Sequence, residues 1–236
     1  MKSPTSLGEQ WIEVETTAST QSLAATYLLE DSPIGVIYAH EQTQGKGRFD
    51  RTWVSQTGDS LTYSLIFRAY PDHPKPYLIG MAAALAVAGV LHCKLRWPND
   101  LVFGELKVGG ILTQLMPDSK GRLVAVVGIG INLNQQSFPP EIAEIATSLS
   151  LARGGHYDPE LIGHKIVERF ASLPEPDEWG DLLPIWDLFD VTPGKKYKLV
   201  SGEVSTALGI GSEGQLLCSV EGESRTVLAA EAMFGV

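Results

Sequence analysis

The sequence is poor in cysteine and in positive charge. Two cysteines in 236 residues, Cys93 and Cys218, are too few for a disulfide framework and fit unpaired, buried thiols in a reducing cytoplasm. The 18 lysines and arginines are outnumbered by 28 aspartates and glutamates, so the formal net charge is −10. Because an acidic body repels polyanions, we expect no binding to DNA, RNA or anionic membranes unless the cations are locally concentrated.

Long hydrophobic runs and several familiar catalytic patterns are also missing. The longest apolar run, residues 78–91, is too short to span a bilayer comfortably, and the first residues have no apolar signal-peptide core. The five histidines show no paired ligand spacing, neither cysteine has a C-x-x-C partner, and no serine lies in a G-x-S-x-G elbow. Nucleophilic and metal-centred catalysis are therefore disfavoured, and we expect the protein in the cytoplasm.

The remaining composition is that of a globular α+β protein, with 44% hydrophobic and 19% charged residues. Periodicity predicts helices at 20–30, 77–91, 140–148, 158–172 and 178–189. It predicts strands at 35–39 and 61–67, and an antiparallel hairpin made by 108–115 and 123–132. After residues 191–194 short β-like runs alternate with glycine-rich turns. We therefore predict a main domain around a mixed sheet in residues 1–190 and a small β domain in residues 191–236.

The most unusual stretch is the polar loop of residues 42–53 (QTQGKGRFDRTW), here called the basic loop. Its glycines, Gly45 and Gly47, allow backbone N–H groups to approach an anion closely. Three cations can neutralise phosphate or carboxylate; they are Lys46, Arg48 and Arg51. The loop is not a Walker A motif, because its Gly-Lys pair is followed by glycine. Taken alone, it could equally be a solvated basic turn.

Three further segments combine a backbone feature with a polar side chain. In residues 96–101 (RWPNDL), Asn99 and Asp100 follow a proline and could orient a hydroxyl, hold Mg²⁺ or shape a turn. Lys107 precedes the Gly109-Gly110 pair, where a surface lysine beside a β-bulge is the simpler explanation. Residues 128–134 (GIGINLN) end a predicted strand with the amide side chain of Asn132. They lack the third glycine of a dinucleotide-binding fingerprint.

Taken in order, these segments resemble the biotin–protein ligase family. The match begins at residues 15–21 (ETTASTQ), which are similar to the family's E-x-x-x-S-T-N segment, and continues with the Gly-Arg-Gly-Arg-type loop that ends at Trp53. The K-W-P-N-D-L-like, K-x-x-G-I-L and G-I-G-I-N segments follow in the family's order, so the resemblance covers nearly the whole chain. It implies a mixed, largely antiparallel sheet with helices, of the class II synthetase-like type, followed by a small SH3-like β-barrel.

The resemblance also implies an activity. The carboxylate of biotin attacks the α-phosphate of ATP to give biotinyl-5′-AMP, and a carrier lysine then displaces AMP. The expected small molecules are biotin, ATP and Mg²⁺ held by the substrate, with no protein-bound metal. The expected partner is the biotin carboxyl carrier protein of acetyl-CoA carboxylase, with neither DNA nor membrane, and a homodimer is compatible with the resemblance. The family's regulatory members carry an N-terminal helix-turn-helix domain, for which the 18 residues before Ser19 are too few.

Roles carried over from the resemblance fall on thirteen positions. The residues implied to bind biotin are Ser19, Thr20, Gln42, Gly45, Gly47, Arg48, Lys107 and Gly110. Those implied to bind the nucleotide are Arg48, Arg51, Trp53, Asn99, Lys107 and Asn132, and those implied in catalysis are Lys107, Arg48 and Lys46. Three positions depart from the family pattern: Lys46 replaces the usual arginine, Arg96 the usual lysine and Gln21 the usual asparagine.

Two other functions remain open. A lipoate–protein ligase or octanoyltransferase has a related fold and also acylates a carrier lysine, whereas a non-catalytic sensor would bind biotin or nucleotide and deliver nothing. The basic loop with Trp53 argues against the lipoyl branch.

Overall fold

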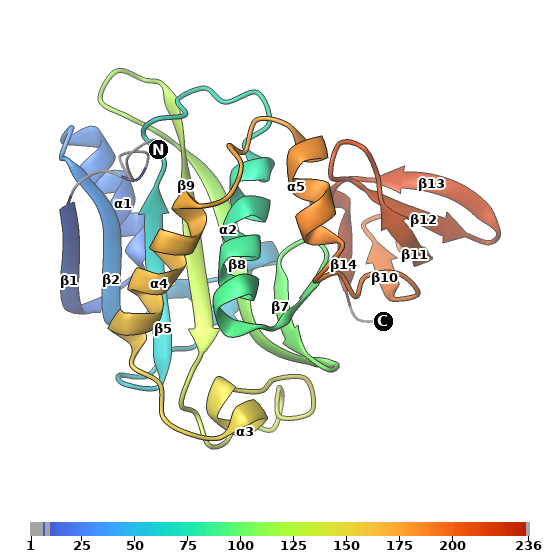
Figure 1. The fold of residues 1–236 in the computed structure, drawn as a ribbon, viewed down its shortest axis with the longest axis horizontal. Coiled ribbons are helices and arrows are strands. Elements are labelled where there is room, and N and C mark those ends of the chain that lie inside the picture. Colours follow the sequence, from blue (N-terminus) through green and yellow to red (C-terminus); the bar gives the residue numbers. More distant parts are fainter. Residues whose placement is uncertain (1–6, 8–9, 235–236) are drawn as a thin grey trace.

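The computed structural model describes residue 7 and residues 10–234 of the chain, and within them a seven-stranded sheet forms the main layer (Figure 1). Its spatial order is β1 (Gln10–Thr17), β2 (Ile34–Gln42), β5 (Ser60–Ile66), β9 (Leu123–Asn132), β8 (Leu106–Pro117), β7 (Asp100–Phe103) and β6 (Lys94–Arg96). The β1–β2 pair is parallel and every other neighbouring pair is antiparallel. The predicted mixed, largely antiparallel sheet is confirmed.

Helices cover both faces of this sheet. The larger hydrophobic core lies between one face and three helices, α2 (Tyr77–Leu91), α4 (Pro159–Ala171) and α5 (Trp179–Trp186). On the opposite face α1 (Thr20–Leu29) buries Ala24 and Leu28 against Ile37 and Val126. The predicted helices at these four places are confirmed, α2 to the residue. At 15 residues α2 is the longest described helix, and none in the described part of the chain has the length and apolar character to cross a bilayer.

A second, five-stranded antiparallel sheet lies at one end of the molecule, beside α5 (Figure 1). Its order is β13 (Glu223–Val227), β12 (Leu216–Val220), β11 (Val204–Ile210), β10 (Lys196–Leu199) and β14 (Ala232–Phe234), and a 3₁₀ turn, η3 (Ala229–Glu231), precedes β14. Hydrogen bonds tie it to the main body; among them, Trp97 Nε1 donates to Gly214 O at 3.0 Å, and Tyr197 Oη donates to Trp97 O at 2.7 Å. The predicted small β unit is therefore present.

The predicted helix at residues 140–148 is wrong. The backbone of this segment bonds to the start of β8 instead: Lys107 N donates to Ile145 O, and Thr147 N donates to Lys107 O, both at 2.8 Å. These bonds occupy groups that a helix would have paired internally. The helix starts only afterwards as α3 (Leu149–Arg153), where the Ser148 hydroxyl accepts from Leu151 N as an N-cap.

Local detail that the periodicity did not predict lies at the edges of the large sheet. Strand β1 is outside the predicted set, as are the short strands β6 and β7 that flank the 97–99 turn. The basic loop is a miniature hairpin rather than irregular chain, because β3 (Gly45–Lys46) pairs with β4 (Thr52–Trp53) around the 3₁₀ turn η2 (Arg48–Asp50). Cys93 and Cys218 are free and buried, as predicted.

Candidate active site

A cavity of about 580 Å³ opens on the α1 face of the large sheet. Its volume is in the usual range for a small-molecule site. Twelve of the thirteen positions singled out from the sequence line it; they are Ser19, Thr20, Gln42, Lys46, Gly47, Arg48, Arg51, Trp53, Asn99, Lys107, Gly110 and Asn132. The thirteenth, Gly45, lines a neighbouring groove on the same loop. Segments far apart in the sequence therefore meet at one place.

Hydroxyl and amide groups form one end of the cavity, at the N-terminus of α1. Gln42 Oε1 accepts from Thr20 N at 2.8 Å and from Thr20 Oγ1 at 3.1 Å, and Thr20 Oγ1 accepts from Ser64 Oγ at 2.8 Å. Gln42 N donates to Ser55 Oγ at 2.8 Å, which fixes the strand end that carries the amide. Because two donors occupy the amide oxygen, the Gln42 amide nitrogen is the end of this group that can donate to a ligand.

The basic loop forms the outer wall of the cavity. A Cβ at Gly45 would lie 2.4 Å from Trp53 O, so the close pairing of β3 with β4 requires glycine at this position. Glycine is required again across the cavity, where a Cβ at Gly130 would lie 2.5 Å from Trp53 Cε2. The two glycines thus allow the Trp53 ring to lie directly against β9. In the described part of the chain, buried Trp53 Nε1 has no hydrogen-bond partner.

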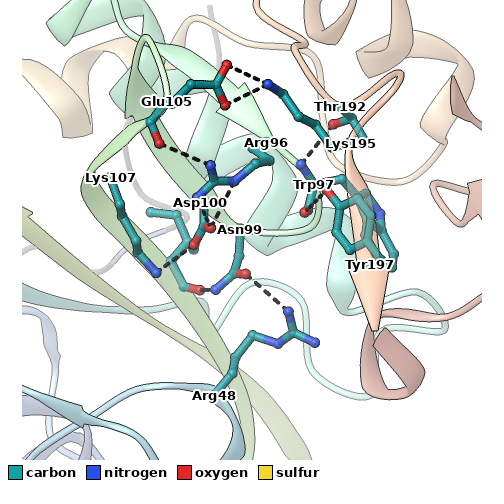
Figure 2. A network of polar contacts seen from close by, with 11 residues as sticks. Arg48, Arg96, Trp97, Asn99, Asp100, Glu105, Lys107, Thr192, Lys195 and Tyr197 are labelled. Carbon is teal, nitrogen blue, oxygen red and sulfur yellow. Dashed lines mark hydrogen bonds and ion pairs between the residues drawn. The ribbon is translucent and has the colours of Figure 1, made fainter. Parts of the chain in front are cut away.

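Arg48 extends from the loop toward the small sheet. Its Nη1 donates to Asn99 Oδ1 at 3.2 Å (Figure 2), and its Nη2 donates to the carbonyls of Ala229 and Ala232. Burial lowers the pKa of the Arg48 guanidinium, and attraction to Asp100 offsets this only in part. A half-buried cation bound to neutral acceptors gains most from an anion, because charge-assisted hydrogen bonds are stronger than neutral ones.

Lys107 belongs to a cluster of charges on the inner wall of the cavity (Figure 2). Its Nζ lies 2.6 Å from Asp100 Oδ1, while Arg96 Nη2 lies 2.9 Å from Asp100 Oδ2. Burial alone would raise the pKa of Asp100, but the two cations outweigh burial and hold that pKa below its usual range. One buried carboxylate therefore serves two cations, and Lys107, with 35% of its side chain exposed, is the one that faces the cavity.

Asn99 and Asn132 are held by the backbone around them. Asn99 Nδ2 donates to Ile111 O at 2.7 Å, and Ile111 N donates back to Asn99 O at 2.9 Å. Asn132 Nδ2 donates to Thr147 O at 3.1 Å, which ties the end of β9 to the segment before α3. Both amides are therefore preorganised at the cavity wall rather than free on its surface.

Several lining residues were not predicted from the sequence. Asp100 was considered as a group that could orient a hydroxyl, hold Mg²⁺ or shape a turn but was not among the predicted site residues, and Phe234 comes from the last described strand. Phe138 and Pro139 form an apolar end of the cavity together with three residues of the segment mispredicted as a helix, Ile142, Ile145 and Ala146. Gln135 lines the cavity as well; its Nε2 donates to Ser60 Oγ at 2.7 Å, and its buried Oε1 has no partner among the described residues. The wrong helix prediction concealed the contribution of residues 140–148 to the cavity.

A metal cluster is not part of this arrangement: the residues that the structure describes contain no group of three His, Cys, Asp or Glu side chains able to hold an ion. The cavity instead combines a hydroxyl–amide end, an apolar end and cations between them. Such a site can bind an elongated ligand with a polar head and a negatively charged centre.

Comparison with known proteins agrees with this geometry. Residues 14–134 match the model of the biotin/lipoate A/B protein ligase family. The chain is 32% identical over 246 residues to the bifunctional ligase/repressor BirA of Bacillus spizizenii, covering 97% of this chain and 75% of that protein. It is 26% identical over 216 residues to the biotin–[acetyl-CoA-carboxylase] ligase of Paracoccus denitrificans, covering 84% and 90% respectively.

The fold is shared with a solved structure as well. The biotin protein ligase from Aquifex aeolicus, solved in complex with biotin and ATP, matches with a TM-score of 0.75 at 26% identity, over 95% of this chain and 98% of that one. With a family model that spans half of the chain and a relative 32% identical over nearly all of it, this protein belongs to the biotin/lipoate A/B protein ligase family.

Proposed function

We propose that this protein is an ATP-dependent biotin–protein ligase. The observation that carries the proposal is the cavity itself, in which a hydroxyl–amide end, four basic side chains and an apolar end line one space of about 580 Å³. Biotin offers a ureido ring to hydrogen-bond and a carboxylate to neutralise, and ATP adds an anionic triphosphate and a flat, largely apolar base. The Aquifex relative, described as binding biotin and ATP, supports the same pair of substrates.

In the first half-reaction a biotin carboxylate oxygen bonds to the α-phosphorus of ATP, the α–β P–O bond breaks, and pyrophosphate leaves. Two anions must meet, so the site has to neutralise charge as it develops on the phosphorus. We assign this to Lys107, Arg48 and Lys46, with Gly45 and Gly47 letting the loop that carries two of these cations wrap the carboxylate and phosphates. Ser19, Thr20 and Gln42 would hold the ureido ring, and Gly110 would let the backbone approach biotin.

The nucleotide would lie toward the apolar end, with Arg51, Trp53, Asn99 and Asn132 around it. Trp53 Nε1 and Gln135 Oε1 support this placement, because buried polar atoms without a protein partner are suited to a ligand that supplies one. We expect Mg²⁺ to enter with the phosphates of ATP as part of that substrate, where it neutralises phosphate charge.

In the second half-reaction a lysine amine attacks the acyl carbon of biotinyl-5′-AMP, the bond to phosphate breaks, and AMP leaves with the amide formed. We propose the biotin carboxyl carrier protein of a carboxylase as the source of that lysine and the cytoplasm, which supplies ATP, as the place of reaction. We also propose a domain boundary near residue 190, which the separate strand orders of the two sheets support.

One assay separates this function from its alternatives. The protein is incubated with MgATP, an apo carrier domain and either biotin or lipoate, and both pyrophosphate and acylated carrier are measured. A biotin ligase yields pyrophosphate and acylated carrier in the incubation with biotin and neither product in the incubation with lipoate. Preference for lipoate would replace the proposal with the lipoyl branch, and pyrophosphate without acylated carrier would indicate a sensor.

A further inference from the structure

Arg96 lies behind the cavity wall and is 5% exposed, yet its guanidinium binds a residue that lines the cavity. Nε and Nη2 donate to Asp100 Oδ2 at 3.3 and 2.9 Å, and Nη1 donates to Glu105 O at 3.3 Å (Figure 2). This is a sequence position where the resemblance would place lysine. The fork of an arginine can make these three bonds in one plane, whereas an ammonium is a point charge on a flexible stem.

The charges in this cluster do not cancel. Arg96 and Lys107 contribute two positive charges and Asp100 one negative charge, which leaves one positive charge at the cavity wall. Because Arg96 occupies Oδ2, the Asp100 carboxylate is shared and cannot neutralise Lys107 alone. Without Arg96 the remaining pair would be neutral, and Lys107 would be held to the carboxylate at the expense of a bound anion.

The small sheet holds Arg96 in place. The Phe234 ring of β14 lies against the guanidinium face, with Arg96 Cζ 3.5 Å from the ring centroid. Phe234 packs edge-on against Tyr197 at a centroid distance of 5.7 Å, and Tyr197 Oη donates to the carbonyl of Trp97, the residue after Arg96. An aromatic face both stabilises the cation and excludes water from it. A chain of contacts therefore joins the carboxyl-terminal strand to Lys107.

We propose that Arg96 is a positioning residue: it shares the Asp100 carboxylate, so that Asp100 does not neutralise Lys107 and the ammonium remains available to the substrate. Phe234 fixes Arg96 in this role. The role rests on the proposed function, in which Lys107 meets the carboxylate and α-phosphate as the adenylate forms. Arg96 itself touches neither substrate in this scheme. Its effect is exerted through Asp100.

The test is Arg96→Met, assayed for pyrophosphate release from biotin and MgATP with carrier absent. We expect kcat for adenylate formation to fall on the order of tenfold to a hundredfold, less than for loss of a donor that touches the reacting atoms. The fall in kcat should exceed any rise in KM, and Arg96→Lys should recover most of the loss because it restores the charge. Arg122→Met is the matched control, since Arg122 also pairs with an aspartate four residues away, at the far turn of the β8–β9 hairpin.

A double variant separates the charge argument from a structural one. Arg96→Met with Asp100→Asn leaves Lys107 as the single charge of the cluster, so adenylate formation should be several-fold faster than in Arg96→Met alone. A double variant no faster than Arg96→Met, or a single variant at the wild-type rate, would overturn the positioning role and leave the proposed function standing. A wild-type protein that forms no biotinyl-AMP would overturn the proposed function instead.

Folding is monitored for every variant by thermal unfolding. If Arg96→Met does not fold, Phe234→Leu carries the test, because leucine keeps an apolar cover over the guanidinium but removes the aromatic face. We expect a several-fold lower kcat with an unchanged unfolding temperature. A wild-type kcat in Phe234→Leu would break the proposed link between the small sheet and Lys107.

Discussion

Arg48 and Ala232 are 184 positions apart in the chain, yet Arg48 Nη2 donates to Ala232 O at 3.2 Å. The contact joins the basic loop to β14, two elements that both contribute residues to the cavity lining. A carbonyl is a neutral acceptor, and a carboxylate or phosphate binds a guanidinium more strongly. An anionic ligand is therefore expected to draw Arg48 away from Ala232 and to change the contacts that hold the whole loop.

The first prediction concerns the order of residues 44–55. Gly45 and Gly47 stiffen the chain little, and the loop cations repel one another until an anion arrives, so biotin with MgATP should protect this segment from trypsin. The measurement is the rate of cleavage after Lys46, Arg48 and Arg51 with and without both substrates. Cleavage after Lys120, in the exposed β8–β9 turn, is the internal control and should not change. Equal rates in the loop would refute ligand-induced ordering.

The second prediction concerns the contact of Trp53 with Gly130. A methyl group at this position would overlap the indole ring, so Gly130→Ala should displace Trp53 and weaken binding of the adenylate more than it destabilises the fold. Gly209→Ala is the control, because a Cβ there meets no atom within 4 Å. Calorimetric titration with biotinyl-AMP measures binding of the adenylate, and intrinsic fluorescence follows unfolding. Tight binding by Gly130→Ala, equal to that of Gly209→Ala, would remove Trp53 from the binding site.

The third prediction is that Lys107→Ala impairs adenylate formation far more than biotin binding. Removal of one preorganised charge-stabilising donor costs about 2–4 kcal/mol of transition-state stabilisation. Pyrophosphate release at saturating substrates measures the loss, and biotin affinity is measured separately by calorimetry. Lys120→Ala controls for loss of an exposed lysine on the same hairpin. Turnover near that of the wild type would exclude Lys107 from the chemistry.

The fourth prediction follows from the lowered pKa of Asp100. A carboxylate whose pKa is lower in the folded state stabilises the fold above its unfolded pKa, and this contribution is lost as pH falls through the folded value. The free energy of unfolding of the wild type should therefore exceed that of Asp100→Asn at neutral pH. The difference should shrink once the pH is below the usual carboxyl range. Urea titrations of both proteins across acidic pH test this, and a constant difference would contradict it.

Much of the fold could be predicted because local signals and tertiary structure agree in it. Helix α2 is a continuous apolar run, and the β8–β9 hairpin has a turn where Asp118 accepts from the backbone of Lys120 and Arg122. Residues 140–148 show the limit of such signals. Two of their backbone bonds go to Lys107, some forty positions earlier, and no local pattern records that pairing.

In the candidate site too, some features could be predicted from the sequence and others depend on contacts between distant segments. Its thirteen predicted residues were implied by a family resemblance carried by several short segments, and all but Gly45 line one cavity. The roles of Arg96 and Phe234 could not be predicted from either segment alone, because Arg96 is the last residue of β6 and Phe234 is the last residue of β14. Their contact exists only because the small sheet packs against the turn between β6 and β7.

The last prediction concerns Arg48→Lys. A guanidinium can hold a carboxylate or phosphate through two parallel hydrogen bonds, whereas an ammonium offers one compact charge. Position 46 is already a lysine, so Arg48 is the sole guanidinium in the Gly-Lys-Gly-Arg core of the loop. If Arg48 closes the loop over biotinyl-AMP, the variant should fold and activate biotin but release part of the intermediate into solvent, where it acylates exposed lysines.

The experiment mixes Arg48→Lys with biotin, MgATP, apo carrier and an unrelated bystander protein, and compares biotin on the two proteins. Bystander labelling should rise and the preference for carrier should fall, because free biotinyl-AMP reacts without recognising its target. Arg122→Lys, which alters an arginine–aspartate pair remote from the cavity, should leave the preference unchanged. Bystander labelling at the wild-type level with normal carrier transfer would show that Arg48 is not the clamp. Retention of the intermediate would then depend on Arg51 or on the loop backbone.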